Sequence, residues 1–291
     1  MAQDMIRIPA YEWPGGHRCA VVFSADVDAE SPFVWMNRGQ PVNTLGELEQ
    51  RRFGPRRGLA RLVDLLAEFG ASGSFYVPGM VMERYPWIAP GLLDEGHEVG
   101  LHGYYHERME TLDDDAFNTV MSRSLEIHAA QGATAPVGFR SPAWELGPHQ
   151  IELLRAAGVA YDSSLMGFDH PYTIGGLTEI PVQWAIDDAI YFRYFGGGRD
   201  TGPPANPMQV LESWIMEFDA VAATGSLFMV TVHPWMSGRA PRIEMLRRLF
   251  THIRSREGVW WTTAGDVARW HVASVNAERF RVAAETVRTD I

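Results

Sequence analysis

The segment Cys19-Ala-Val-Val-Phe-Ser-Ala-Asp-Val-Asp28 joins a short apolar, β-branched run to a pair of aspartates. Such a run predicts a buried strand. Further along, residues 59–69 carry apolar side chains at helical spacing and stop at Gly70, a common signal for the end of a helix. The next strand is expected over residues 74–77. A strand, a helix and a second strand in this order indicate a parallel βαβ unit.

The same alternation continues along the chain. Further strands are expected at residues 98–102, 137–140, 159–162, 227–232 and 259–262. Further helices are expected at residues 88–94, 113–131, 148–157, 208–223, 241–256 and 264–272. About seven such units in one chain predict an α/β fold with a parallel barrel or a strongly curled sheet. We expect a single domain over residues 1–291, with its core at about residues 20–270.

Two segments depart from the alternation. Residues 28–58 contain Pro32, Pro41 and Pro55 and are expected to form a long N-terminal loop insert. Residues 196–204 are rich in glycine and proline and are expected to form a flexible connector. Long loops in compact domains are usually functional or covering elements, so we expect residues 28–58 to cover the functional site. Residues 273–291 are expected to form a helical tail.

The composition excludes several classes of protein. Of the 291 residues, 46% are hydrophobic and 21% are charged, which argues against disorder and coiled coil. The net charge of −11 argues against partners such as nucleic acid or an anionic membrane. Cys19 is the one cysteine, so an internal disulfide and a cysteine-rich zinc site are excluded. The first residues lack the pattern of a secretion signal, and we expect a cytoplasmic protein.

Polar residues follow several of the expected strands. Asp26 and Asp28 follow the first strand, and His102 and His106 follow the third. The later strands are followed by Arg140, Asp162 and His233. Because the carboxyl ends of parallel strands meet at one rim of a barrel, we expect these side chains to converge there.

The two histidines are candidate metal ligands. His102 and His106 are spaced i and i+4, so a helical turn would put both rings on one face, where they can bind one divalent ion. In isolation, such a pair is more often two unconnected surface or core histidines. Two imidazoles and a nearby carboxylate make the three protein ligands of a catalytic zinc site with open positions. Of the two aspartates, one would bind the metal and the other would accept a proton; alone, both could be loop caps.

The other strand-end residues suggest supporting roles. A buried Arg140 would lower the pKa of a neighbouring carboxylate and orient it, although an arginine after a strand is equally often a surface residue. His233 would serve as a general acid, with a core histidine as the alternative. Asp162 would hydrogen-bond such a histidine and hold it charged. Trp144, directly after the arginine-containing loop, is expected beside a substrate.

Five short segments resemble, in order, the motifs of the polysaccharide deacetylase family (carbohydrate esterase family 4). They are Ser24-Ala-Asp-Val-Asp, His102-Gly-Tyr-Tyr-His, Arg140-Ser-Pro-Ala-Trp, Asp162-Ser-Ser and Val232-His233. The resemblance spans about residues 20–270. It implies a distorted (β/α) barrel, commonly of seven strands, and a metal-dependent hydrolase.

The resemblance also implies roles for individual residues. Asp26 would be the catalytic base, tethered by Arg140, and His233 the general acid. A backbone N–H near Ala143 would help hold the oxyanion. The ligands of zinc, or of cobalt, manganese or nickel, would be Asp28, His102 and His106. The residues expected to contact substrate are Ala143, Trp144 and Tyr105.

The first motif departs from the family pattern, because Val27 separates two aspartates that are usually adjacent. Other segments resemble an intracellular branch that contains peptidoglycan-deacetylase-like proteins, cyclic imide hydrolases and metal-independent allantoinases. They are Phe53-Gly-Pro-Arg-Arg-Gly, Val77-Pro-Gly and residues 96–107. Members of this branch tend to be tetramers whose long N-terminal loops cover the site. The resemblance therefore implies a homo-oligomer, a tetramer, that acts on a small molecule.

These observations predict a metal-dependent hydrolase of carbon–nitrogen bonds other than peptide bonds, acting on a small N-acylated or cyclic amide. One alternative is a metal-independent, allantoinase-like ureide hydrolase. Another, from a different class, is a catalytically dead carbohydrate-binding protein on the same fold.

Overall fold

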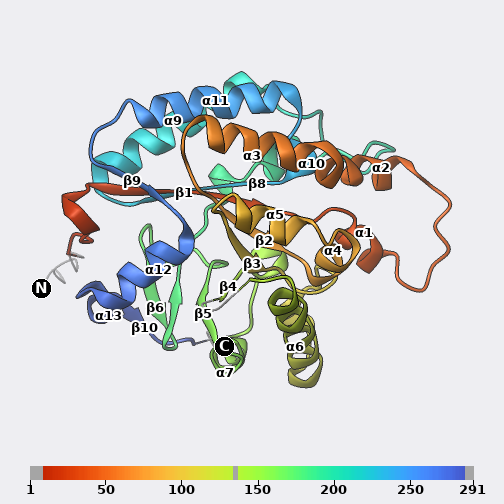
Figure 1. Ribbon diagram of the computed structural model, residues 1–291, viewed down its shortest axis with the longest axis horizontal. Coiled ribbons are helices and arrows are strands. Elements are labelled where there is room, and N and C mark those ends of the chain that lie inside the picture. The colour runs from red at the N-terminus through yellow and green to blue at the C-terminus, as the bar shows by residue number, and fades with distance from the viewer. Residues whose placement is uncertain (1–8, 134–136, 286–291) are drawn as a thin grey trace, which may run out of the picture.

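A single curled sheet forms the centre of the protein in a computed structural model that describes residues 9–133 and 137–285 (Figure 1). The strand order is β10-β6-β7-β5-β4-β3-β2-β1-β8, and β9 pairs with β1. The strands are β1 (Cys19–Asp26), β2 (Ser74–Val77), β3 (Glu98–Leu101), β4 (Val137–Phe139), β5 (Val159–Asp162), β6 (Tyr172–Ile174), β7 (Leu177–Glu179), β8 (Leu227–Val232), β9 (Val259–Thr262) and β10 (Arg281–Val282).

The sheet is mostly parallel and curls into a half-barrel, as predicted. All seven strands expected from the sequence are present as β1 to β5, β8 and β9. Ser24 of β1 lies opposite Ser74 of β2 on one side and Thr231 of β8 on the other. The sequence patterns missed β6 and β7, an antiparallel hairpin at one edge of the sheet. Its turn is Gly175-Gly176, where both residues have positive φ, a conformation that glycine adopts without steric cost.

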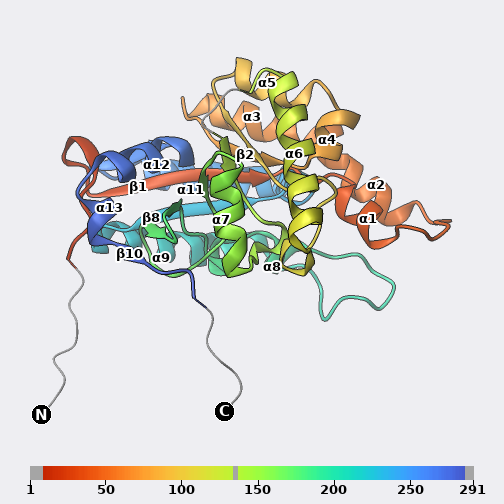
Figure 2. The same cartoon turned by 90° about the horizontal axis from the view of Figure 1, so that it is seen from below.

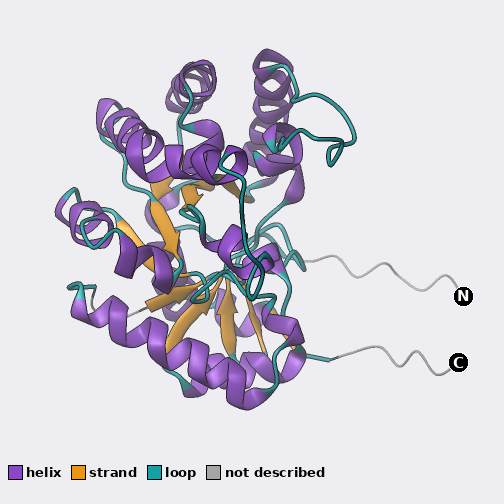
Figure 3. Cartoon of the chain, turned by 90° about the vertical axis from the view of Figure 1, so that its right-hand side faces the viewer, coloured by secondary structure: helices purple, strands orange, loops and turns teal. Residues whose placement is uncertain are grey.

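Helices surround the sheet, and Figure 3 shows them as an outer layer around the strands. The longer helices are α3 (Leu59–Glu68), α6 (Asp114–Ala130), α7 (Pro148–Ala156), α9 (Pro207–Thr224), α11 (Ala240–Arg254) and α12 (Ala264–Ala273). The short ones are α1 (Ser31–Met36), α2 (Gly46–Phe53), α4 (Gly79–Arg84), α5 (Ile88–Asp94), α8 (Ala189–Phe192), α10 (Pro234–Ser237) and α13 (Asn276–Arg279). None of the helices within the described ranges is long and apolar enough to cross a membrane.

Burial of one apolar stripe per helix holds the layers together. In α3, Leu59, Leu62, Leu65 and Leu66 recur at helical spacing and are all buried against the core. Each such side chain contributes roughly 1.5–3 kcal/mol when it leaves water. All eight residues of β1 are buried, and this strand pairs with β2, β8 and β9. The aspartates at its carboxyl end are thereby fixed in position.

The segment 28–58 is not the loop that its prolines suggest. It contains α1, α2 and a π-helical turn at Gly54–Gly58. Ion pairs within α2 support its helical conformation: Glu47 pairs with Arg51 at 3.0 Å and Glu49 with Arg52 at 3.0 Å. A Cβ atom on Gly58 would lie 1.9 Å from the Pro234 carbonyl oxygen, so only glycine permits this turn to pack against α10.

The C-terminal segment also differs from the predicted helical tail. After α12 it forms the short helix α13 and then β10, which pairs with β6. The remainder of the predicted tail, residues 286–291, lies outside the described residues.

Candidate active site

The predicted strand-end residues gather around one cavity, with a single exception. The cavity has a volume of about 480 Å³ and is lined by Asp26, Asp28, His102, His106 and His233, among others. These residues follow β1, β3 and β8, whose parallel arrangement brings their carboxyl ends to the same rim of the sheet. Arg140 lies directly behind the cavity, fully buried, with its guanidinium on Asp26.

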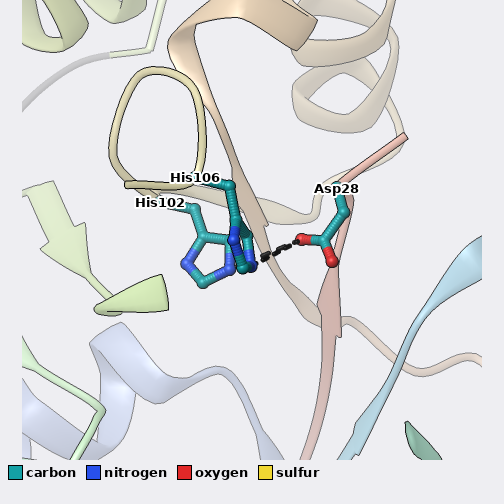
Figure 4. Close-up of side chains that lie close together, drawn as sticks. All are labelled: Asp28, His102 and His106. Atoms are coloured by element: carbon teal, nitrogen blue, oxygen red, sulfur yellow. Dashed lines mark ion pairs between the residues drawn. The ribbon is translucent and has the colours of Figure 1, made fainter. Parts of the chain in front are cut away.

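Asp28, His102 and His106 point toward one another (Figure 4). The Asp28 Oδ1 atom lies 3.5 Å from His102 Nε2 and 3.7 Å from His106 Nε2. This Oδ1 atom is buried and has no hydrogen-bond partner among the described residues. A buried carboxylate oxygen without a partner is costly, and a cation at this point would satisfy it. The donor set, two imidazole nitrogens and one carboxylate, suits zinc or a similar divalent ion.

Electrostatics in this triad keep the carboxylate ionised. Burial would raise the pKa of Asp28, but the neighbouring imidazoles of His106, His102 and His233 hold it well below its usual range. Burial lowers the pKa of His106 to about 4, so its ring is neutral at neutral pH and carries a lone pair for a metal.

A loop, and not a helical turn, brings the two histidines together. Residues 102–108 form no helix, and positive φ angles at Gly103 (65°) and His106 (66°) reverse the chain instead. The buried Glu107 carboxylate accepts hydrogen bonds from the backbone N–H groups of Tyr104 and Tyr105, both at 2.9 Å, which fixes the loop. The prediction that the two rings lie close together is therefore confirmed, but the helical turn expected from the i, i+4 spacing is wrong.

The orientation of His102 is fixed from behind. Its Nδ1 atom lies 2.7 Å from the Arg140 carbonyl oxygen, to which it donates a hydrogen bond. Nδ1 therefore carries a proton, and Nε2 is the ring nitrogen that faces Asp28. A hydrogen bond of this kind to the ring nitrogen that does not bind the metal is typical of metal-ligating histidines.

Arg140 connects Asp26 to the core of the sheet. Its Nη1 atom donates to Asp26 Oδ1 at 2.8 Å and to Ser24 Oγ at 3.0 Å, while its Nε atom donates to the Ser163 carbonyl at 2.9 Å. Burial opposes the charge of this guanidinium, but Asp26 raises the pKa of Arg140 above its usual value. Asp26 is thus held by one oxygen, and its Oδ2 lies 3.9 Å from His102 Nε2.

The carboxylate partner of His233 is Asp188, a residue that sequence reasoning missed. His233 donates from Nδ1 to Asp188 Oδ1 at 2.7 Å and from its backbone N–H to Oδ2 at 3.0 Å. Burial lowers the pKa of His233, but Asp188, Asp28 and Asp187 outweigh it and raise the pKa to about 10. His233 is therefore protonated at neutral pH, with Nε2 toward the cavity, 3.7 Å from Asp28 Oδ2.

Asp162 is the exception among the strand-end residues. It is the last residue of β5 and is fully buried, but it does not line the cavity and does not contact His233. Ser164 donates to its Oδ1 at 2.7 Å, and Glu179 of the neighbouring β7 lies against it. Burial raises the pKa of both carboxyl groups, Asp162 and Glu179. The prediction that Asp162 orients His233 is wrong.

Two of the three expected substrate contacts line the cavity. Ala143 and Trp144 do so, with unusual φ angles of 59° and 57° that turn this loop toward the site. The Trp144 ring lies beside that of Trp184, with centroids 4.3 Å apart. Tyr105 does not line the cavity, because the turn at Gly103 directs it against Tyr104 instead.

Comparison with known proteins identifies the family of this chain. The sequence profile described as polysaccharide deacetylase matches residues 53–161. The crystal structure of a candidate polysaccharide deacetylase from Mycobacterium smegmatis superimposes with a TM-score of 0.86 at 32% identity, covering 98% of this chain and 99% of the other. This chain belongs to the polysaccharide deacetylase family. The family supports a hydrolase of N-acetyl amide bonds, as the sequence motifs predicted.

Two further proteins are similar to this chain over most of their length. A peptidoglycan deacetylase from Helicobacter pylori is 26% identical over 278 residues, which span 85% of this chain and 94% of that protein. The crystal structure of the Puue allantoinase matches with a TM-score of 0.81 at 20% identity, covering 93% of this chain and 95% of the other. At that identity the allantoinase match concerns the fold alone.

Proposed function

We propose that this polysaccharide deacetylase-like protein is a divalent-metal-dependent hydrolase of an amide-type carbon–nitrogen bond in a small N-acylated or cyclic amide. One observation carries the proposal. Two imidazole nitrogens lie 3.5 and 3.7 Å from the same unpartnered, buried oxygen of Asp28, at the base of a cavity. A divalent ion held by Asp28, His102 and His106, for which zinc is our first candidate, would lower the pKa of water and polarise a carbonyl group.

The surrounding residues carry the proton transfers. Asp26, oriented by Arg140, accepts the proton of the water that attacks the carbonyl carbon. The backbone N–H at Ala143, where the loop turns into the cavity, donates to the developing oxyanion. His233, protonated and held by Asp188, delivers a proton to the departing nitrogen.

The insert at residues 28–58 supports a small substrate. Pro32, Trp35 and Met36 of this segment line the cavity together with the catalytic residues. Figure 2 shows the loop after α1 and the loop after α8 projecting from the same end of the molecule. The two segments contact each other, since Arg199 pairs with Glu47 at 2.8 Å and Gln50 donates to the Tyr194 carbonyl at 2.7 Å. A cavity roofed in this way favours a compact substrate over a polymer. Assembly into a homotetramer and a cytoplasmic location stay predictions.

Removal of the metal separates this proposal from the metal-independent alternative. Exhaustive chelation is expected to abolish hydrolysis, and added zinc or cobalt to restore it, because in this proposal the ion supplies the activation of water and of the carbonyl group. Turnover would be measured on acetylated amino sugars, N-acetylated amino acids, succinimide, hydantoin and allantoin, before and after chelation. Full activity after chelation would favour an allantoinase-like ureide hydrolase. Oligosaccharide binding without any turnover of a metal-loaded sample would favour the carbohydrate-binding alternative.

The pair Asp188→Asn and Asp162→Asn tests which aspartate supports His233. Asp188→Asn removes the anion that raises the pKa of His233, so that pKa falls and the alkaline limb of the pH–rate profile moves to lower pH. We also expect kcat to fall at least about tenfold, because an acid of this type contributes about 10² to 10⁴ in rate. Asp162→Asn is the matched control, another buried aspartate outside the cavity, and should leave the alkaline limb unmoved. The reverse pattern would restore Asp162 as the partner.

A further inference from the structure

Four arginines line the cavity that holds the candidate catalytic residues. They are Arg38, Arg51, Arg108 and Arg193. The chain as a whole has an excess of acid, with 25 basic against 36 acidic residues, so a cluster of guanidinium groups does not follow from composition. They come from three separate parts of the chain: the insert, the loop after His106 and the end of α8. None of them has a role in the hydrolysis described above.

The four arginines divide into paired and unpaired groups. Arg51 is buried and pairs with Glu47 at 3.0 Å, and Arg108 pairs with Glu110. Arg38 and Arg193, by contrast, have no carboxylate within ion-pair distance among residues 9–133 and 137–285. Both are exposed to solvent as well as lining the cavity. Two uncompensated positive charges therefore face whatever enters.

Arg38 is held in position before any ligand arrives. Its guanidinium carbon lies 3.8 Å from the centroid of the Trp35 ring, and its Nη1 atom donates to the Trp35 carbonyl at 2.7 Å. A guanidinium stacked in this way keeps most of its donors free for an anion. Because its geometry is already fixed, little conformational entropy remains to be lost on binding.

Much of the remaining cavity lining is aromatic. Trp35, Trp144, Trp184 and Trp235 all line the cavity. Apolar walls reduce the screening by water and strengthen a charge-assisted contact at the rim. The cavity thus combines the candidate metal ligands, aromatic side chains and two unpaired guanidinium groups in one lining.

We propose that the substrate carries a carboxylate, which Arg38 and Arg193 bind while the amide carbonyl reaches the candidate metal ligands. This inference rests on the proposed function and names its substrate class: a compact N-acyl or cyclic amide with an acidic group, such as an N-acylated amino acid. A neutral substrate has no anionic group with which these two guanidinium groups could form an ion pair.

Binding of a matched pair of probes tests the inference independently of turnover. The probes are 4-phenylbutyrate and 4-phenylbutanol, which differ in the carboxylate, titrated calorimetrically into the zinc-loaded protein. We expect the carboxylate to bind at least about tenfold more tightly than the alcohol, as charge-assisted hydrogen bonds to guanidinium provide. In the double variant Arg38→Gln/Arg193→Gln this preference should fall below about threefold. Arg57→Gln, an exposed arginine outside the cavity, removes the same charge as either single change and should leave the preference intact.

Equal binding of the two probes would overturn the inference. So would a preference that survives in the double variant, because the carboxylate would then be bound by the metal or elsewhere. Hydrolysis of N-acetylleucine and N-acetylleucinol separates this failure from that of the proposed function. Turnover of both compounds with equal kcat/KM would refute the carboxylate site and keep the hydrolase. Turnover of neither these compounds nor any member of the wider substrate panel by the metal-loaded enzyme, with the binding preference present, would refute the hydrolase and support the anion site.

Discussion

His102→Ala is expected to abolish turnover and to release most of the metal. The change removes one of three ligands, and the remaining pair, Asp28 and His106, cannot complete the site. It also removes the hydrogen bond to the Arg140 carbonyl, which leaves that buried oxygen unsatisfied. The measurements are metal content after gel filtration and turnover on the best substrate found.

A second substitution separates loss of the ligand from loss of structure. His102→Asn can place its amide N–H near the position of Nδ1 and keep the bond to the Arg140 carbonyl, but it has no atom at the position of Nε2. We therefore expect a melting temperature close to that of the parent, with metal and turnover lost. His149→Ala, an exposed histidine that pairs with Asp114 on the surface, should retain both. Full metal occupancy in His102→Asn would show that the triad is not the site.

The sequence predicted the triad because its members are attached to regular elements. Asp28 follows a strand whose apolar run is unambiguous, and His102 directly follows β3. In a parallel sheet the ends of neighbouring strands meet, so strand assignment alone brings these side chains close together. The prediction of a helical turn between His102 and His106 is wrong, because positive φ at a histidine has no signature in the sequence.

Asp188 could not be found by the same reasoning. It lies between strands, and it reaches His233 because Asp187 forms a bridge beside Thr231, next to the end of β8. Asp188 and His233 are about 45 residues apart in the chain, so their contact is a tertiary one. It depends on the path that the segment after β7 takes across the sheet. The available signal was two adjacent acids inside the otherwise apolar stretch 180–192.

Asp162 was misassigned for the opposite reason. It occupies the end of a parallel strand, as the prediction required, but the hairpin of β6 and β7 adds a neighbour that the sequence patterns did not reveal. Glu179 of β7 lies opposite Asp162, so the neighbour of Asp162 is this carboxyl group and not His233. Asp162 and Glu179 lie against each other away from the cavity lining, and burial raises the pKa of both carboxyl groups.

Asp26→Asn is expected to lower turnover by about 10² to 10⁴ while the metal stays bound, because the amide cannot accept a proton from water. Asparagine keeps an oxygen for the hydrogen bond from Arg140, so the fold should survive. The guanidinium of Arg140 nevertheless loses the anion that compensates its burial, and breaking such a buried pair costs about 3–5 kcal/mol. The free energy of unfolding, metal content and kcat would be measured on the same preparation.

The combination of these readouts distinguishes a base from a ligand. If Asp26 were a metal ligand, metal would be lost in Asp26→Asn, as in His102→Ala. Asp26 Oδ2 is 3.9 Å from His102 Nε2, against 3.5 Å for Asp28 Oδ1, and its other oxygen is already held by Arg140. Asp28→Asn, two residues away in the chain, is therefore the matched comparison: it should lose metal and turnover together. A variant Asp26→Asn with kcat within tenfold of the parent would remove Asp26 from the mechanism.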